Sequence, residues 1–381
     1  QLARLLHAPI AKALLGKDVL PDDSPYTTGT IGVFGTSATA AVMKEADTLL
    51  LIGTSFPYIS YLPDPSRVRG VQIDINPERI ALRFPVEVGL VGDSAETLRV
   101  LIPLIEQHHD SRLLDLAREK MTEWWQLMER RGTSRDLPMR PQTVAWELGK
   151  RLRDDAIICG DSGQNTLYVA RQIKIRGTQR FSCSGMLASM GCALPYAIGA
   201  QIAFPARQVI AFAGDGGLTM VLGELATCVK HQLPIKIFVL KNNTLGMIRW
   251  EQMMFLGNPE YGTELQNIDF GRVAEAFGLR AFHVEQPVDL ADAIDAALAH
   301  PGPVLVEATI DPDEPLMPGQ IKPEQAENYA CALKNGQPNA RRIALTLFRD
   351  AVEDLGENRR TIPEQLREKV PELTPRETRK A

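Results

Sequence analysis

The chain has 381 residues, enough for two domains, and 44% of them are hydrophobic, which suits ordinary cores. A formal net charge of −5 gives no reason to expect a nucleic-acid partner. The five cysteines show no metal-ligand spacing, and no apolar run approaches the roughly 18 residues of a membrane span. Composition therefore predicts a soluble, cytoplasmic α/β protein with reduced cysteines.

The first part of the chain shows the alternation of apolar strands and helices that is typical of Rossmann-like folds. Strands are predicted at Asp47–Ile52, Val68–Asp74 and Val86–Leu90, and a helix at Ala95–Gln107. The strand ends carry glycine or an acidic residue. Such ends bind nucleotides in this fold class, although simple chain reversal is the alternative. No GxGxxG fingerprint is present, which argues against a nicotinamide cofactor.

Changes of composition divide the chain into parts. Residues 1–131 are predicted to form one domain, residues 132–141 a Pro- and Arg-rich linker, residues 142–326 a second domain, and residues 327–381 a charged C-terminal tail. Gln1–Leu6 reads as the middle of an amphipathic helix without a cap. We therefore expect a truncated first domain, in a polypeptide that is a fragment, a processed chain or a partial one.

The linker is preceded by a long charged helix, predicted at Leu114–Arg131. Its Trp124 and Trp125 are expected to be packing anchors. The second domain opens with a helix at Gln142–Leu152 and a strand at Ala156–Cys159. Further elements are predicted at Phe270–Phe277, Asp289–Leu298, Pro303–Ala308 and Arg341–Leu355.

The most informative stretch is a strand–loop–helix–strand–loop unit of about 40 residues. An apolar strand, Gln208–Ala213, ends in the glycine-rich loop Gly214–Gly217, and a second strand, Ile235–Leu240, ends in Lys241–Thr244. Both loops should therefore lie at the carboxyl edge of a parallel sheet, where ligands bind in such folds.

The residues of these two loops suit a metal ion that carries a diphosphate. Glycines on both sides of Asp215 allow backbone N–H groups to approach an anion closely. Asp215 supplies a carboxylate oxygen and Asn242 an amide oxygen, which are ligands that Mg²⁺ prefers. Either motif alone would more often be a simple turn, but their order and spacing together favour the metal site.

Gly-Asp-Gly followed about 25 residues later by Asn-Asn resembles the signature of thiamine-diphosphate enzymes. The resemblance implies that Asp215, Asn242 and the Thr244 carbonyl bind the metal. Lys241 stands where the family has its first asparagine, so Asn242 matches the second, metal-binding one. Asn243 is the fallback ligand.

The same resemblance covers other segments of the second domain. Polar residues at Gly160–Asn165 follow the strand Ala156–Cys159, where side chains could bond a phosphate or cap the next helix. In Phe181–Gly199, Met190 matches the bulky residue that props the cofactor in a V shape, although a methionine is also common core filler. Met247, Trp250 and Glu251 are weaker candidates for substrate contact, with surface packing as the alternative. The residues implied for thiamine diphosphate are Gln164, Asn165, Met190, Gly214, Asp215, Gly216, Gly217, Asn242, Thr244, Gly246 and Met247.

The first domain resembles the middle domain of the same family. Its GTSFPY and VQIDINPERI segments are similar to the pyruvate oxidase and pyruvate:quinone oxidoreductase branch, where this domain binds FAD. Acetolactate synthases bind FAD with a similar domain, so the segment separates the two branches only modestly. The residues implied for FAD are Gly32, Val33, Gly53, Thr54, Ser55, Phe56, Pro57 and Asp74.

The resemblance implies a thiamine-diphosphate-, Mg²⁺- and FAD-dependent oxidative decarboxylation of a 2-oxo acid, with pyruvate the first candidate and quinone or oxygen as electron acceptor. In the family a glutamate from an N-terminal pyrimidine-binding domain activates the cofactor, and no residue of this chain replaces it. We therefore expect the chain alone to be incomplete for catalysis. Another chain, or an absent N-terminal part, would supply the glutamate. The expected partners are further copies in a homodimer or homotetramer, or a chain that carries the missing domain.

Two other functions remain open at this stage: an acetolactate-synthase-like carboligase with structural FAD, and a non-catalytic cofactor-binding or scaffold homologue. The helix at Arg341–Leu355 has a usable apolar face, formed by Ile343, Leu345, Leu347, Phe348, Val352 and Leu355. A terminal amphipathic segment meets the membrane in the pyruvate:quinone branch. Because this helix carries mixed charge, we expect it to dock on its own protein or on a partner rather than on lipid.

Overall fold

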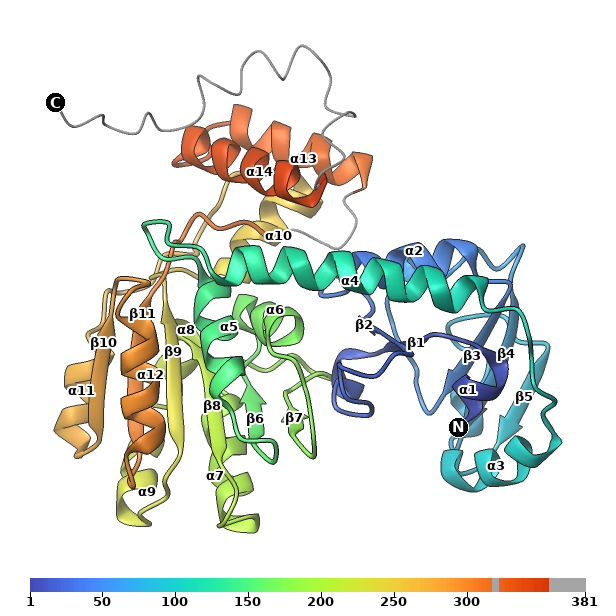
Figure 1. Ribbon diagram of the computed structural model, residues 1–381. Helices are drawn as coiled ribbons and strands as arrows, with labels where there is room; N and C mark the ends of the chain where they lie inside the picture. Colours follow the sequence, from blue (N-terminus) through green and yellow to red (C-terminus); the bar gives the residue numbers. More distant parts are fainter. Residues whose placement is uncertain (317–321, 356–381) are drawn as a thin grey trace, which may run out of the picture.

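The computed structural model describes residues 1–316 and 322–355 (Figure 1). Within these residues the strands form three parallel sheets of two, three and six strands. The two-stranded and three-stranded sheets belong to the N-terminal unit, and the six-stranded sheet, called the large sheet below, belongs to the C-terminal unit. This arrangement confirms the predicted α/β class with two Rossmann-like parallel-sheet parts and a helical C-terminal segment.

The N-terminal unit pairs β1 with β2 and places β4 between β3 and β5. Helix α3 is shorter than predicted and gives way to a 3₁₀ turn, because Pro103 has no N–H for the next helical bond. The elements are α1 (Leu2–Leu6), β1 (Ile10–Lys12), β2 (Thr27–Thr30), α2 (Ser37–Glu45), β3 (Thr48–Ile52), β4 (Arg69–Asp74), β5 (Val88–Val91) and α3 (Ser94–Leu101), with 3₁₀ turns at Leu14–Gly16, Ile59–Tyr61, Pro77–Arg79 and Ile102–Leu104.

The large sheet has the strand order β10-β11-β9-β8-β6-β7. The chain runs outward from β6 to β7 and then returns to the other side of β6 with β8, so β6 and β8 flank a topological switch point. Its elements are α5 (Pro141–Arg151), β6 (Ile157–Gly160), α6 (Gln164–Gln172), β7 (Arg180–Ser182), α7 (Ala193–Ala203), β8 (Val209–Gly214), α8 (Asp215–Thr219), α9 (Glu224–Lys230), β9 (Lys236–Lys241), α10 (Gly246–Leu256), α11 (Phe270–Phe277), β10 (Arg280–Val284), α12 (Leu290–Ala299) and β11 (Val304–Thr309).

Helices cover both faces of the large sheet, which explains why its central strands are mostly apolar. On β8, Ile210 and Phe212 pack in one core with α5, α6 and α12, whereas Val209 and Ala211 pack on the opposite side with α7, α9 and α11. Two edge strands, β7 and β10, were not predicted. Strand β7 has only three residues, and most of β10 is partly or fully exposed, so neither shows a continuous apolar run.

Helix α4 (Arg112–Gly132) runs from the N-terminal unit to the C-terminal unit (Figure 1). Trp124 is buried among the side chains of α4 and Trp146 of α5, and the Lys174 ammonium lies 4.2 Å from the Trp125 ring centroid. Both tryptophans are therefore packing residues, as predicted. We propose to divide the chain between the end of α4 and the start of α5, where the linker was expected.

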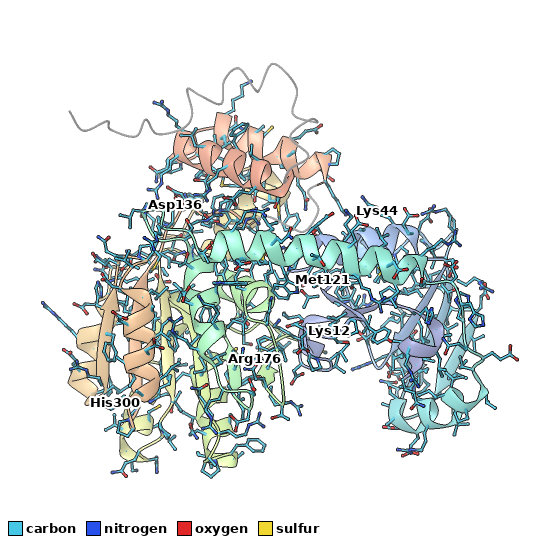
Figure 2. The ribbon with its side chains drawn as sticks, in the orientation of Figure 1. Lys12, Lys44, Met121, Asp136, Arg176 and His300 are labelled. Atoms are coloured by element: carbon cyan, nitrogen blue, oxygen red, sulfur yellow. The ribbon has the colours of Figure 1, made fainter. Side chains whose placement is uncertain are left out.

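A buried ion cluster also joins the two units, near the position of Lys12 in Figure 2. Lys12 and Lys17 both reach Asp22, at 2.6 and 3.2 Å, and Asp22 accepts the N–H of Ile175 at 2.7 Å. Lys17 also donates to the carbonyl of Ala170 in α6 at 3.0 Å. Because these charges are paired and buried, the N-terminal unit is tied directly to the segment around α6.

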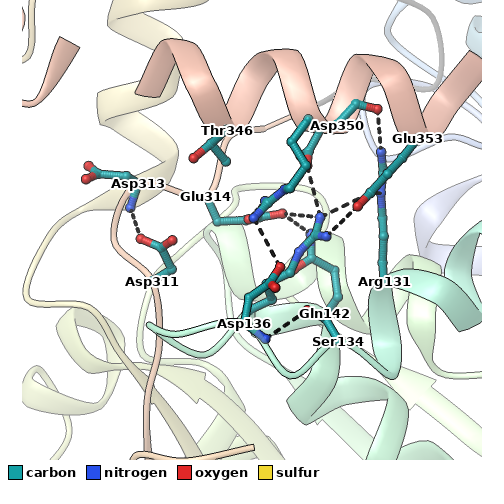
Figure 3. A network of polar contacts seen from close by, with 12 residues as sticks. Arg131, Ser134, Asp136, Gln142, Asp311, Asp313, Glu314, Thr346, Asp350 and Glu353 are labelled. Atoms are coloured by element: carbon teal, nitrogen blue, oxygen red, sulfur yellow. Dashed lines mark hydrogen bonds and ion pairs between the residues drawn. The ribbon is translucent and has the colours of Figure 1, made fainter. Parts of the chain in front are cut away.

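Two further helices, α13 (Pro323–Lys334) and α14 (Ala340–Leu355), pack on the chain's own surface (Figure 1). Figure 3 shows the polar network beneath α14. Arg140 bonds Glu314 at 3.1 Å and Asp350 and Glu353 of α14 at 3.0 and 2.9 Å, while Arg349 of α14 bonds Glu314 at 2.6 Å. Of the two predicted docking surfaces, its own protein or a partner, the structure shows this helix docked on its own protein over residues 340–355. The rest of the predicted tail, residues 356–381, lies outside the described residues.

None of the helices that the structure describes is both long enough and apolar enough to cross a lipid bilayer.

Candidate cofactor site at the switch point of the large sheet

Three loops meet at the carboxyl edge of the large sheet, after β6, β8 and β9. These strands are neighbours, with β8 between β6 and β9. The loops contain the three groups of candidate residues that the sequence indicated, namely Gly160–Asn165, Gly214–Gly217 and Asn242–Gly246. The parallel pairing therefore brings segments that are far apart in the sequence to one place.

Asp215 links the loop after β8 to the loop after β9. Its Oδ2 accepts the backbone N–H groups of Asn242 at 3.0 Å and of Asn243 at 2.6 Å, and its Oδ1 accepts that of Gly216 at 2.9 Å. Burial raises the pKa of Asp215, and the N–H group of Asn243 opposes that rise by stabilising the charged form. The structure thus places the Asp215 carboxylate beside Asn242, as the proposed metal site requires.

The second and third candidate metal ligands lie in the same short loop. Asn242 Oδ1 accepts the N–H of Thr244 at 3.2 Å, and the Thr244 carbonyl accepts that of Gly246 at 2.9 Å. Asn243, the fallback ligand, has a left-handed backbone with φ of 55°, and its buried Oδ1 has no hydrogen-bond partner among the described residues. Its side chain therefore remains an alternative oxygen donor.

The donor set fits a hard divalent cation that also binds phosphate. Over residues 1–316 and 322–355, no group of three or more His, Cys, Asp or Glu side chains could hold a metal ion. The candidate ligands instead combine the carboxylate of Asp215 with the neutral oxygens of Asn242 and Thr244. Mg²⁺ is commonly bound in this way, with one or two carboxylates and the remaining positions left to substrate phosphates and water.

Lys241, which departs from the family pattern, has a partner elsewhere. Its Nζ lies 2.8 Å from Glu307 Oε1, and Glu307 is fully buried in β11. Glu307 also accepts the N–H of Gly271 at 3.0 Å, at the start of α11. The lysine therefore forms a buried ion pair within the sheet layer, and the loop that follows it begins at Asn242.

Three glycines of this site lie close to other side chains, which a Cβ at these positions would displace. A Cβ at Gly246 would lie 2.3 Å from Gln164 Oε1, and one at Gly217 would lie 2.1 Å from Asp161 Oδ2. A Cβ at Gly216 would lie 3.2 Å from Met190 Cε. The glycines thus let Gln164, Asp161 and Met190 approach the loop backbones closely.

Gln164 and Asn165 form the first turn of α6. Gln164 Nε2 donates to the carbonyl of Glu314 at 2.9 Å, and Asn165 Nδ2 donates to the carbonyl of Phe212 at 3.2 Å. Gly163 precedes the helix, and no side-chain hydrogen bond caps it. The capping alternative is therefore not supported, and each amide has its oxygen near a glycine of the site, Gly246 for Gln164 and Gly214 for Asn165.

Asp161 is a site residue that sequence reasoning mentioned only as part of a loop. Its Oδ1 accepts the N–H groups of Ser162 at 2.8 Å, Gly191 at 2.8 Å and Cys192 at 3.1 Å. Burial raises the pKa of this carboxyl group. Asp161 therefore holds the backbone directly after Met190. The sequence signal that could have identified Asp161 is a carboxylate that directly follows a buried strand.

Met190 and the α10 candidates differ in exposure. Met190 is partly exposed and belongs to neither core of the large sheet, so the core-filler alternative does not describe it. Trp250 is fully buried and packs edge-on against Tyr329, with ring centroids 6.2 Å apart. Substrate contact by Trp250 was therefore a wrong prediction. Met247 and Glu251 are partly exposed, and burial raises the pKa of Glu251.

The flavin candidates lie at the carboxyl ends of strands in the N-terminal unit. Gly53–Pro57 follow β3, and Asp74 ends the adjacent strand β4. Asp74 Oδ1 accepts the N–H of Asn76 at 2.9 Å, while its buried Oδ2 has no partner in the described part of the chain. Such an acceptor suits a ribose hydroxyl. Gly32, with φ of 102°, packs against the ring of Phe56 and borders a cleft of about 300 Å³.

The comparisons with known proteins agree with this site. Residues 161–308 match the C-terminal TPP binding domain of thiamine pyrophosphate enzymes, and residues 1–101 match their central domain. The chain belongs to the thiamine pyrophosphate enzyme family.

Several relatives illustrate the range of this family. The chain is 42% identical over 323 residues to YdaP of Bacillus subtilis, a protein named as thiamine pyrophosphate-containing; the match covers 85% of this chain and 56% of the relative. It is 29% identical to the acetolactate synthase large subunit of Pyropia yezoensis, covering 84% and 55%, and 27% identical to the pyruvate oxidase of Lactiplantibacillus plantarum, covering 88% and 56%. The chain thus spans little more than half the length of these curated relatives.

Proposed function

We propose that this chain provides the diphosphate-binding and flavin-binding parts of a thiamine-diphosphate- and FAD-dependent enzyme. Its reaction would be the oxidative decarboxylation of a 2-oxo acid, with pyruvate the first candidate and quinone or oxygen as the electron acceptor. The observation that carries the proposal is the meeting of Asp215, Asn242 and Thr244 at the switch point of the large sheet.

In this proposal Asp215, Asn242 and the Thr244 carbonyl hold Mg²⁺. The Gly214–Gly217 loop, together with the amides of Gln164 and Asn165, would bind the diphosphate. When it is bound, thiamine diphosphate supplies the electron sink that decarboxylation of a 2-oxo acid needs.

The chain's own residues would orient and enclose that cofactor. Met190, whose Cε lies 3.2 Å from the position that a Cβ at Gly216 would take, would support the cofactor from this loop. Met247 and Glu251 lie on α10, directly after the proposed metal-binding loop Asn242–Thr244, and would face the substrate. Burial raises the pKa of Glu251, so this carboxyl group is a candidate for holding a proton near the substrate carboxylate.

We propose that the carboxylate that activates the cofactor's pyrimidine comes from outside these 381 residues. A chain, or a chain segment, that carries a pyrimidine-binding domain would complete the site. We also propose that this chain assembles as a homo-oligomer or pairs with such a chain. The buried, unpaired cysteines Cys159, Cys183, Cys192 and Cys228 fit a reducing compartment, so we propose a cytoplasmic location.

An acetolactate-synthase-like carboligase with structural FAD is the second candidate function. The observation that favours it is the number of relatives named as acetolactate synthases, including that of Pyropia yezoensis. A scaffold that binds the cofactor without turnover is the third.

The first test is cofactor binding. The chain should bind thiamine diphosphate with Mg²⁺, and Asp215→Ala should weaken this binding by at least about tenfold, because it removes the only carboxylate among the candidate ligands. Ser66→Ala, in an exposed loop of the N-terminal unit, is the control. Equal affinity of Asp215→Ala and the wild type would reject the metal site.

The second test separates the three functions. Pyruvate is added to the flavin-loaded chain together with the completing domain. Bleaching of the flavin supports the oxidase, and formation of acetolactate without lasting bleaching supports the carboligase. Binding of both cofactors with neither reaction supports the scaffold.

A further inference from the structure

Helix α6 contacts candidate cofactor loops at both of its ends. Its first turn carries Gln164 and Asn165, which lie beside the proposed diphosphate loops. Its last turn carries Arg171, whose side chain leaves the C-terminal unit and reaches the turn after β2. One helix of nine residues therefore touches both proposed cofactor sites.

Arg171 bonds three successive backbone carbonyls in that turn. Nη2 donates to Val33 O at 2.9 Å and to Gly35 O at 3.1 Å, and Nε donates to Phe34 O at 3.4 Å. Three carbonyl dipoles that converge on one point repel each other unless a cation lies there. The planar guanidinium can serve all three at once, which a lysine ammonium on a single stem does less well.

Arg171 adds to the bonds that the turn makes by itself, in which the N–H of Thr36 donates to Thr30 O at 3.0 Å. Gly35 N–H donates to Gly32 O at 2.8 Å, and Thr30 Oγ1 donates to Phe34 O at 2.9 Å. Gly32 has a left-handed backbone with φ of 102°. Arg171 is itself held firmly, since it is buried and its guanidinium lies 5.6 Å from the Trp124 ring centroid.

The same turn borders the cleft of about 300 Å³ in the N-terminal unit. Gly32, Gly35 and Thr36 line one side of this cleft, and Tyr61 and Lys322 also line it. Gly32 and Val33 are the residues of this turn that are proposed to contact FAD. The shape of the turn on its cleft side is therefore set, through the backbone, by the carbonyls that Arg171 holds.

We propose that Arg171 is a positioning residue for the flavin: from α6 it fixes the Val33–Gly35 turn in the form that the cofactor contacts. The inference rests on the proposed function in so far as FAD binds at this turn. It also means that the helix that begins at the diphosphate site ends at the flavin site, so the two sites share one rigid element.

The variant that tests this is Arg171→Met, which keeps much of the apolar stem and removes the guanidinium. Arg176→Met is the matched control. Arg176 also donates to a backbone carbonyl, that of Gly149 at 2.9 Å, and pairs with Asp154 at 2.7 Å, so its contacts stay within the C-terminal unit. Arg171→Lys, which keeps the charge, is the conservative variant and covers the case in which Arg171→Met does not fold.

Two readouts are needed, both on the 381-residue chain. The first is hydrogen–deuterium exchange of residues 33–36 without ligand, and the second is FAD affinity, followed by flavin fluorescence. Arg171→Met should speed exchange at the turn and weaken FAD binding, each by about tenfold or more, as expected for lost charge-assisted bonds. For both readouts, Arg171→Lys should give values between those of the wild type and those of Arg171→Met. Arg176→Met should change neither readout.

The outcomes separate this inference from the proposed function. If the wild type binds FAD and Arg171→Met binds it equally well, the inference is wrong while the flavin site stands. If Arg176→Met has the same effects as Arg171→Met, the role is general stability and the inference is also wrong. If the wild type fails to bind FAD, the proposed flavin function fails and Arg171 cannot position that cofactor.

Discussion

Replacing Gly246 by alanine tests the position of Gln164, the residue that joins α6, the proposed metal-binding loop and the segment after β11. A Cβ at Gly246 would lie 2.3 Å from Gln164 Oε1, whereas real Cβ contacts below 3.0 Å essentially do not occur. Gln164 Oε1 is at the end of a side chain, so the Gln164 amide is the group that must give way. It cannot do so freely, because its Nε2 donates to the Glu314 carbonyl at 2.9 Å.

The magnitude follows from that hydrogen bond. A buried polar group left without its partner costs about 1–3 kcal/mol. Expressed wholly in ligand affinity, this corresponds to a loss of roughly 5- to 150-fold. Glu314 is unable to follow the amide, because Arg140 and Arg349 hold its side chain at 3.1 and 2.6 Å (Figure 3). We therefore expect Gly246→Ala to lower both thermal stability and affinity for thiamine diphosphate.

Isothermal titration with thiamine diphosphate and Mg²⁺ measures the affinity, and thermal unfolding measures the stability. Gly199→Ala is the control, since a Cβ at this position in α7 would meet no atom within 4 Å. That variant should bind the cofactor like the wild type and be slightly more stable, because alanine favours a helix interior. Wild-type affinity and melting temperature for Gly246→Ala would refute the placement of Gln164.

Three more predictions concern buried charges. Asp161→Ala should lower the free energy of unfolding by about 2 kcal/mol or more, because it leaves the N–H of Gly191 without an acceptor. Asp161→Asn should recover most of this loss, and equal melting temperatures of the two variants would contradict the prediction. Glu307→Gln should lower the free energy of unfolding, measured in denaturant, by about 3–5 kcal/mol, because Lys241 keeps a buried, uncompensated charge. Adding Lys241→Met should restore part of the lost stability. Burial raises the pKa of Asp350 from 3.8 to about 7. Between about pH 4 and about pH 7 this carboxyl group is therefore protonated in the native state and ionised in the unfolded state. Stability should therefore fall as pH rises from about 4 to about 7, and Asp350→Asn should flatten this slope in melting curves; an unchanged slope would assign it to other groups.

Much of the candidate site could be predicted from the sequence because its signals are local. Buried parallel strands appear as apolar runs, and the residues that end them, such as Gly214–Gly217 and Asn242–Thr244, follow directly along the chain. A parallel sheet then places these strand ends at one edge, which is why Asp215 and Asn242 could be paired without coordinates. The docked helix α14 was recognisable for a similar reason, since its apolar face repeats with helical spacing.

Contacts between distant segments could not be read in this way. Gln164 and Glu314 are 150 residues apart, and nothing in either segment names the other as partner. Trp250 illustrates the same limit, because helical periodicity did not reveal that α13 covers it and removes it from the substrate side. The edge strands β7 and β10 were missed because a short or half-exposed strand has no long apolar run.

The amino-acid sequence by itself determined the class of fold, the position of the Gly214–Gly217 and Asn242–Thr244 loops and the candidate oxygen donors in them, because these depend on the residues next to each strand end. Only the tertiary structure decided which side chains hold those loops in place. Asp161 on Gly191, Glu307 on Lys241 and Arg171 on the Val33–Gly35 turn all bridge segments that folding alone brings together. Their hydrogen bonds and ion pairs depend on distances of a few ångströms in space, and separation along the chain does not specify those distances.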